Sequence, residues 1–456
     1  MINTLYLPEL REMLREENTG ELREFCEAIH PARAAEFMEG LSAEESWQVL
    51  QHADPATRVD IFGYLDEDKQ VKILETGDPE EVGQLVAELP ADDRVDLLQQ
   101  LDPAIVEQTL PLMPAEERRD ILRLGAYPEG TAGAVMTSEI PRLTETATVG
   151  DTFEEIKKKA ADWETIYYLY VVDEENHLRG VVAARQLLAN VGRPERSISD
   201  LMERDVLSVD VDEDQERVAD RVAQYDLHAI PVVDREHHLL GIITHDDIID
   251  VVREEATEDA HRIGAVEPLG EGYLDVHWFK LVRHRGLWLT ILFFAALLTA
   301  FALRTYEEQL GRVVWLAWFI PLIISSGGNS GSQSATLVIT GLTTGEVRLT
   351  DWWRIVRREL LMGGCLGGFL AAIAYVVALV LVDDPISALV IPVTILLVVV
   401  CGTLSGATLP LIFKRLGLDP AMMSNPFVAG IIDIAGIVIY MQCAAALVIE
   451  LRTVVT

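Results

Sequence analysis

Asp433 is the side chain of this sequence that most needs a chemical explanation, because it is the only acidic or basic side chain between Met422 and Ile449. A carboxylate inside a bilayer costs roughly 2.5–3.5 kcal/mol on insertion scales, and intramembrane carboxylates commonly mark ion paths or proton relays. Small neighbours allow close helix approach and leave space for water; they are Ala429, Gly430, Ala435 and Gly436. We therefore predict an ion path at Asp433, with a helix-packing aspartate as the structural alternative.

A second unusual stretch is "SSGGNSGSQSATLVITGLTTG", residues 325–345, where uncharged hydrogen-bonding side chains interrupt another apolar run. Its glycines at 327, 328 and 331 predict a broken or loosened helix, which is tolerated in a membrane where it lines a wet cavity. The candidate pore-lining residues are Asn329, Ser332, Gln333 and Thr336. A polar helix interface without a pore is the alternative.

A third group is acidic and lies before the apolar runs. Like charges at helical spacing repel each other, and carboxylate oxygens are the ligands that Mg²⁺ and Ca²⁺ prefer. An ordinary solvated face is the alternative for this group, and His237 and His238 are expected simply in a hairpin turn. The acidic residues are Asp214, Glu216, Asp226, Asp246, Asp247, Asp250, Glu254, Glu255, Glu258 and Asp259.

Five apolar runs are long enough to cross a bilayer, at 286–303, 314–342, 360–382, 386–412 and 422–449. Basic residues precede the first run and fill the loops between runs two and three and between runs four and five. The positive-inside rule then places the N-terminus in the cytoplasm and the C-terminus outside. The sequence predicts a multi-pass protein of the cell (inner) membrane.

The N-terminal region, 1–128, carries a repeat of turn-like starts every twelve residues, from "LSAEE" at 41 to "MPAEE" at 113. Pro and acidic residues at each start suit a helix N-terminus, and apolar patterns such as "VDLLQQL" follow. Short helices at a fixed period predict a small α-solenoid. Such a surface serves docking or sensing rather than catalysis.

Two segments spaced by 61 residues share one pattern: "YLYVVDEENHLRGVVAARQLL" at 168 and "AIPVVDREHHLLGIITHDDII" at 229. The pair resembles tandem CBS domains, which implies an α+β fold that binds adenosine nucleotides or regulates a neighbouring domain. In the second copy Gly241, Thr244 and Asp247 keep a pattern that holds ribose and phosphate, so Thr244 and Asp247 are candidate ATP ligands. The first copy has Ala183 and Gln186 instead.

The composition excludes several functional classes. The 456 residues carry a net charge of −36, although residues 280–456 hold only 10 acidic against 12 basic side chains. An acidic front half repels nucleic acid and attracts cations. The four cysteines show no metal or disulfide spacing, the N-terminus is too charged for a signal peptide, and no arrangement of nucleophile, base and oxyanion donors is visible. We therefore expect no enzyme.

Taken in order, the acidic helical repeat, the CBS pair, an acidic connector and five apolar runs with "GGNSGSQSAT", "SNP" and "DIAG" resemble the MgtE family of Mg²⁺ channels. The resemblance implies five regions: 1–128, 133–195, 196–253, a connector helix at 254–283 and a pore domain at 284–456. It implies a homodimer in which two copies of Asp433 face each other, with the Ala429 carbonyl and Asn425 nearby. It further implies regulatory Mg²⁺ ligands at Asp60, Asp92, Asp214, Glu216, Asp226, Asp247, Asp250, Glu255, Glu258 and Asp259.

The function expected from these observations is a Mg²⁺-selective channel or transporter for magnesium uptake. Cytosolic Mg²⁺ would bridge the acidic regions and close the pore by its higher affinity for the closed state. A proton-coupled transporter of divalent cations would also use a lone intramembrane aspartate. A membrane-anchored sensor without transport would not need the polar second run.

Overall fold

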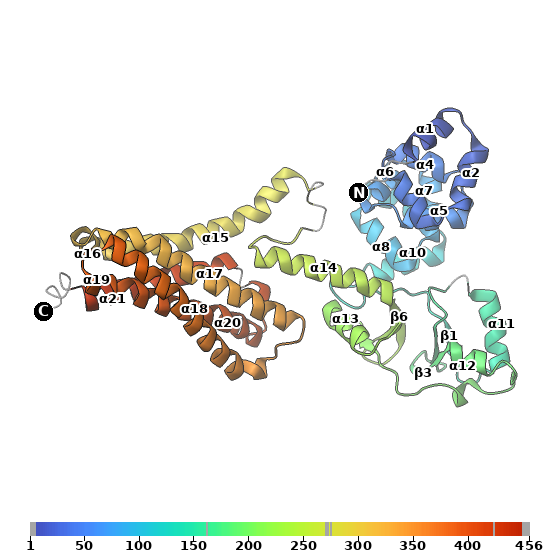
Figure 1. Ribbon diagram of the computed structural model, residues 1–456. Helices are drawn as coiled ribbons and strands as arrows, with labels where there is room; N and C mark the ends of the chain where they lie inside the picture. Colours follow the sequence, from blue (N-terminus) through green and yellow to red (C-terminus); the bar gives the residue numbers. More distant parts are fainter. Residues whose placement is uncertain (1–5, 161–162, 270–272, 274–275, 423–424, 449–456) are drawn as a thin grey trace. The chain divides into compact units, whose positions relative to one another are not determined.

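The computed structural model describes residues 6–160, 163–269, 273, 276–422 and 425–448, which divide into two compact units, Met1–Val252 and Arg253–Thr456 (Figure 1). The first unit contains the helical repeat and the two sheets. The second contains the end of α14 and the long apolar helices.

The helical repeat is built from short helices with capped N-termini. From α4 to α10 the first residue advances by twelve positions each time, which confirms the predicted repeat. Ser42, Asp54, Asp78 and Asp102 each accept a hydrogen bond from a backbone amide of the first turn. The elements are α1 Leu7–Arg15, α2 Thr19–Ala28, α3 Pro31–Met38, α4 Ala43–Leu50, α5 Pro55–Gly63, α6 Glu67–Thr76, α7 Pro79–Glu88, α8 Ala91–Gln100, α9 Pro103–Thr109, η1 Leu110–Leu112 and α10 Ala115–Leu124.

Polar side chains on later helices donate hydrogen bonds to the backbone carbonyl groups at the C-terminal ends of earlier helices. Arg94 on α8 donates from Nε to Val86 O (3.1 Å) and from Nη2 to Leu89 O (2.6 Å) at the end of α7. Lys69 on α6 does the same for the end of α3, with Nζ 2.9 Å from Met38 O. Since the last carbonyls of a helix have no partner within it, these contacts join the repeats into one body.

Each CBS copy forms a three-stranded sheet with the same topology. In both, the first strand is parallel to the second, the second is antiparallel to the third, and the register shifts at equivalent positions, Val171/Val172 and Val232/Val233. The predicted duplication is confirmed. The elements are β1 Arg142–Thr144, α11 Val149–Lys159, β2 Tyr168–Val172, β3 Leu178–Ala183, α12 Ala184–Ala189, η2 Ile198–Asp200, β4 Val209–Asp210, α13 Gln215–Gln224, β5 Ala229–Val233, β6 Leu239–Thr244 and α14 His245–Ile263.

The second unit is helical. Four of its described segments are long and apolar enough to cross a membrane: Trp278–Thr305, Leu349–Leu381, Pro385–Arg415 and Asn425–Leu447. Helix α17 is also long, at 29 residues, but its serines, glycines and asparagine lower its apolar character, so a fifth span stays a prediction. The elements are α15 Trp278–Thr305, α16 Glu307–Arg312, α17 Trp315–Thr343, η3 Leu349–Asp351, α18 Trp352–Leu381, α19 Pro385–Ala388, α20 Val390–Arg415, η4 Pro420–Met422 and α21 Asn425–Leu447.

Two predictions about helix continuity were wrong. Helix α17 runs unbroken through its glycines, because Gly327 and Gly331 lie against the backbone of α20 at Gly402 and Gly406. Absent side chains there permit close packing rather than a break. The connector 254–283 is not one helix either: α14 ends at Ile263 and α15 begins at Trp278. Of the "SNP" start, Ser424 lies outside the described residues.

Candidate pore and cation-binding residues

Asp433 lies on α21, partly exposed, one turn after Ala429. Helix α17 passes directly beside it: a Cβ atom added at Gly328 would stand 3.4 Å from Ala429 Cβ and 3.7 Å from Asp433 Oδ1. These are ordinary van der Waals distances, so Gly328 lies directly against α21 at Ala429 and Asp433. The structure brings the first two candidate groups of the sequence into contact.

The start of α21 is hydrogen-bonded to the polar part of α17. Asn425 Nδ2 donates to Thr336 Oγ1 (3.1 Å), and Ser332 Oγ donates to the carbonyl oxygen of Asn425 (3.2 Å). These contacts fix the N-terminus of α21, with its free amide groups, against α17. Three of the predicted pore residues thus meet in one place.

Asn329 and Gln333 also lie on α17, with exposed side chains. Asn329 Nδ2 donates to Ser325 Oγ one turn earlier (3.2 Å). Spacings of three and four residues place Ser325, Asn329, Ser332 and Thr336 along one side of the helix, which we call the polar stripe of α17. A polar stripe left partly exposed on an otherwise apolar unit suits a water-filled path.

Glu359 is a second carboxylate among the long helices, and the sequence reasoning missed it. Ser334 Oγ on α17 donates to Glu359 Oε2 on α18 (2.7 Å), and Thr403 Oγ1 on α20 donates to the Glu359 backbone oxygen (3.3 Å). The Glu359 side chain therefore joins α18 to α17, and its backbone carbonyl joins α18 to α20. Its position after Arg357 and Arg358 made it look like part of a charged loop.

In the first unit, carboxylates from the helical repeat and both CBS copies come together. Burial, then the charge of Asp247, raises the pKa of Asp92 well above its ordinary value, and Asp92 Oδ1 is buried without a hydrogen-bond partner. Burial raises the pKa of Asp247 to about 6, although Thr244 opposes the rise by donating hydrogen bonds. Burial, then Asp247, raises the pKa of Glu164 to about 7. We call Asp92, Asp93, Glu164, Asp246 and Asp247 the acidic cluster.

Neighbouring carboxylates repel one another when they are ionised, and a divalent cation bound between them would relieve this repulsion. The structure joins the predicted ligands Asp92 and Asp247 here, and it adds Glu164, Asp93 and Asp246, of which only Asp246 belonged to a predicted group. No local pattern marks Glu164, because its neighbours in space come from distant parts of the chain.

Asp60, Asp214, Glu216 and Asp226 of the first unit lie outside the acidic cluster, whereas Asp250 lies close enough to it to raise the pKa of Asp93, after burial and Asp246. Asp60 is exposed on α5. Asp214 caps α13, with Oδ1 accepting from Glu216 N (3.1 Å), and Asp226 follows the same helix with a φ of 50°. Asp250 is exposed on α14.

Thr244 and Asp247, the candidate nucleotide ligands, are engaged with each other at the start of α14. The Thr244 amide donates to Asp247 Oδ2 (3.1 Å), and the Thr244 hydroxyl donates to the same oxygen (2.5 Å). This is the arrangement that caps a helix N-terminus. Nucleotide binding by these residues stays a prediction.

In the second unit, Glu258 and Asp259 near the end of α14 face the loop between α20 and α21. Arg262 bridges two carboxylates, with Nη2 2.6 Å from Glu258 Oε2 and Nη1 2.6 Å from Asp419 Oδ2. Burial, then the charge of Asp419, raises the pKa of Asp259 to about 6. Asp419 was missed because "LDPAM" gives only a helix-start signal; Glu255 lies one turn before Asp259 and is partly buried.

Three family profiles match this chain. The profile described as "Divalent cation transporter" (MgtE) matches residues 320–443, the MgtE intracellular N domain matches 29–130, and the CBS domain matches 132–193 and 198–254. Among solved structures, the soluble part of a magnesium transporter has a TM-score of 0.51 at 37% identity, covering 55% of this chain and 97% of that one. The cytosolic domain of the Mg²⁺ channel MgtE in complex with ATP has a TM-score of 0.50 at 36% identity, covering 53% and 98%.

Full-length relatives extend the match into the apolar helices. The magnesium transporter MgtE of Thermus thermophilus is 40% identical over 325 residues, 71% of each chain. The magnesium transporter MgtE of Enterococcus faecalis is 35% identical over 321 residues, 70% of this chain and 69% of that protein. The order of the helical repeat, the CBS pair and the apolar helices agrees with these matches, and the chain belongs to the MgtE family of divalent cation transporters.

Proposed function

We propose that this protein is a channel for magnesium uptake, with Asp433 as the carboxylate of the permeation path. The observation that carries the proposal is the contact between the polar stripe of α17 and α21, which places hydroxyl and amide groups at Asn425, two turns before Asp433 on the same helix, and Gly328 beside the carboxylate. Mg²⁺ dehydrates reluctantly and is commonly held by one or two carboxylates through retained water. A polar path of this kind suits a hydrated ion that must both enter and leave.

We propose further that the protein is a homodimer with five spans, its N-terminus in the cytoplasm and its C-terminus outside. A two-fold axis beside α21 would bring two copies of Asp433 to one ion. The exposed Asn329 and Gln333 are then covered by the second copy or by the water of the path. This orientation is supported by basic residues near the start of α15, between α17 and the first turns of α18, and at the end of α20.

Cytosolic Mg²⁺ would regulate the path through carboxylates in both units. The acidic cluster of the first unit and the group of Glu258, Asp259 and Asp419 in the second each hold closely placed carboxylates. Mg²⁺ would bind them more tightly in a compact, closed state and shift the population toward it. Protease protection of the first 270 residues should rise with Mg²⁺; unchanged cleavage from zero to tens of millimolar would contradict this regulation. We further propose ATP binding at the CBS pair, which the ATP complex of the similar cytosolic domain supports.

The decisive experiment is Mg²⁺ flux into proteoliposomes with internal Mg²⁺ varied. Asp433→Ala should abolish flux, whereas Asp383→Ala, which removes an exposed carboxylate just after α18, should leave it unchanged. Equal flux through wild type and Asp433→Ala would refute the role of Asp433 in the path.

The same assay separates the two alternatives. A proton-coupled transporter requires flux that follows a pH gradient, with Asp433→Asn abolishing the coupling rather than divalent binding. A sensor without transport requires no flux under any condition. The polar stripe on α17 favours transport over the sensor, because a sensor gains nothing from hydrogen-bonding groups at membrane depth.

A further inference from the structure

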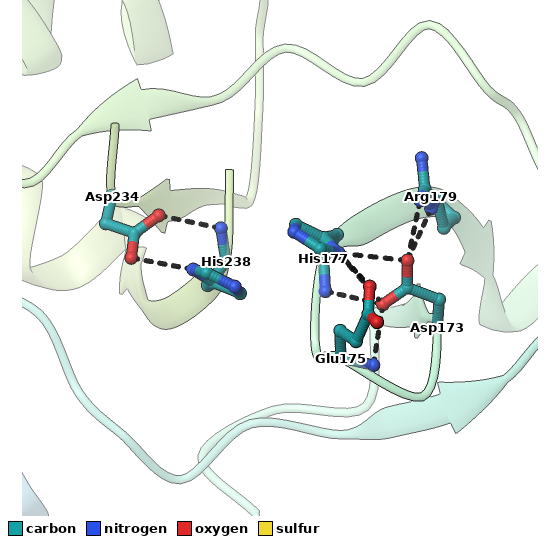
Figure 2. A network of polar contacts seen from close by, with 6 residues as sticks. All are labelled: Asp173, Glu175, His177, Arg179, Asp234 and His238. Carbon is teal, nitrogen blue, oxygen red and sulfur yellow. Dashed lines mark hydrogen bonds and ion pairs between the residues drawn. The ribbon is translucent and has the colours of Figure 1, made fainter. Parts of the chain in front are cut away.

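The hairpin turns of the two CBS copies carry the same three side chains, and neither the pore nor the acidic cluster uses them. The turn between β2 and β3 holds Asp173, Glu175 and His177, and the turn between β5 and β6 holds Asp234, Glu236 and His238; Figure 2 shows all of these except Glu236. The pattern Asp-x-Glu-x-His thus occurs twice, 61 residues apart. The sequence reasoning expected only a turn at His237 and His238.

The two turns position their aspartate and histidine in the same way. The aspartate Oδ1 accepts from the amide two residues later (3.0 and 2.9 Å) and from the amide of the histidine (2.9 and 2.8 Å). The residue before each histidine has a left-handed φ, 67° at Asn176 and 70° at His237. The aspartate Oδ2 contacts the imidazole Nδ1, at 3.0 Å in the first turn and 2.9 Å in the second.

The two turns also contact each other, through their backbones and through their histidine rings. The Leu178 amide donates to His237 O and the Leu239 amide donates to Asn176 O, both at 3.0 Å. Above this pairing the rings of His177 and His238 stack, with centroids 4.4 Å apart and planes 19° from parallel. Each histidine side chain is about a quarter exposed, so stacking fixes both rings while leaving them within reach of solvent.

The first turn adds a third donor. Glu175 Oε2 lies 3.7 Å from His177 Nδ1, and one ligand atom from each of Asp173, Glu175 and His177 lies within 4.8 Å of the others. The Glu175 side chain is 80% exposed and can rotate toward Asp173 and His177. Water can reach the other coordination positions of a cation bound there. Arg179 holds Asp173 in place, with Nε 2.9 Å and Nη2 2.6 Å from Oδ2 (Figure 2).

The donor set decides the class of cation. Mg²⁺ and Ca²⁺ prefer oxygen ligands, whereas imidazole suits Zn²⁺, Co²⁺ and Ni²⁺, which also accept carboxylate oxygens. We propose that the Asp173–His177 turn binds a divalent cation of this second class, with Asp173, Glu175 and His177 as ligands and water completing the coordination. His238 is a positioning residue, which holds the His177 ring by stacking and is itself held by Asp234.

A bound cation takes the Nδ1 position of His177 that faces Asp173 and so replaces the contact between these two side chains. The charges around the rings are the carboxylates Asp173, Glu175, Asp234 and Glu236 and the guanidinium of Arg179. This surplus of negative charge favours a bound cation.

The experiment is Zn²⁺ titration of the full-length protein in detergent by calorimetry, with millimolar Mg²⁺ present to occupy sites that prefer Mg²⁺. Co²⁺ absorption in the visible range gives an independent readout of nitrogen coordination. His177→Ala should lose a Mg²⁺-resistant Zn²⁺ equivalent per chain, and Glu175→Gln should weaken it by at least ~10-fold. Glu174→Gln, which removes the neighbouring exposed carboxylate, is the matched control and should bind as wild type does.

Equal Zn²⁺ affinity in wild type, His177→Ala and Glu175→Gln would overturn the proposal. So would a Zn²⁺ equivalent that Mg²⁺ displaces completely, since that would assign it to the oxygen-only groups. Glu175 is exposed, so its replacement keeps the test valid even if His177→Ala disturbs the stacked turns. The result does not depend on whether Asp433 conducts Mg²⁺.

Discussion

Replacing Glu164 by glutamine tests whether the charge on Glu164 destabilises the folded first unit in the absence of metal. The pKa of Glu164 is raised from 4.5 to about 7, first by burial and then by Asp247, Glu139, Asp246 and Asp93. At 1.36 kcal/mol per pH unit, this difference corresponds to an upper value of roughly 3 kcal/mol. Since Glu164 is partly accessible, solvent screening lowers the expected gain from Glu164→Gln to about 1–3 kcal/mol at pH 8.

The sign of the pH dependence follows from linkage. A carboxyl group with a raised pKa in the folded state favours folding when protonated, so its cost is absent below pH 4.5 and complete above about pH 7. Glu164→Gln should therefore stabilise the first unit at pH 8 and have little effect near pH 4.5. Saturating Mg²⁺ should reduce the gain, because the ion neutralises the same charges.

Hydrogen exchange is the suitable measurement, because it reports local opening free energies in a protein whose units do not unfold together. Amides of α8 and β2 would be followed in the full-length protein with a chelator at pH 8 and pH 5. Glu195→Gln, an exposed change in the first CBS copy, is the matched control. Unchanged hydrogen-exchange protection at pH 8, or an equal gain in protection at both pH values, would refute the destabilising effect of the Glu164 charge.

Three other perturbations follow from the packing. Gly402→Ala would place a Cβ atom 2.5 Å from Gly327 O and should lower the stability of the protein by about 1–3 kcal/mol. Gly364→Ala is the matched control, because a Cβ atom there meets nothing within 4 Å. Equal melting temperatures of the two variants in detergent would contradict the close contact between α17 and α20. Arg94→Met should destabilise the helical repeat by about 2–3 kcal/mol, because two buried carbonyls lose a charged donor, and wild-type protection of α7 in hydrogen exchange would contradict this. Arg262→Gln should enlarge the rise in melting temperature caused by Mg²⁺, since two carboxylates lose their guanidinium; an unchanged rise would count against Mg²⁺ at that place.

The parts of the fold that follow a period were predictable. Twelve-residue spacing and the 61-residue duplication are properties of the linear sequence, and both fixed the elements correctly because each repeat carries its own caps and apolar positions. Asp433 was predictable for a similar reason, since one charge in an apolar run stands out without any knowledge of its neighbours.

The remaining features depend on contacts between distant segments. Glu164 and Asp419 are ordinary acidic residues until folding places them beside Asp247 and Asp259. The glycines of α17 were misjudged because glycine favours both a broken helix and a close helix contact, and only the facing Gly402 decides between them. The proposed roles of His177 and His238 likewise depend on the contact between two turns that are 61 residues apart in the sequence.

The glycine contacts between α17 and α20 restrict how this protein can move. Gly327 and Gly331 on one helix, and Gly402 and Gly406 on the other, are each four residues apart. A slide of one or two residues would press a side chain into the opposite backbone, and the next position at which glycine faces glycine lies about 6 Å away. We therefore expect α17 and α20 to travel as one rigid body, so that a change in the width of the path comes from rotation of that body or from displacement of α21, never from a gradual sliding of the two helices.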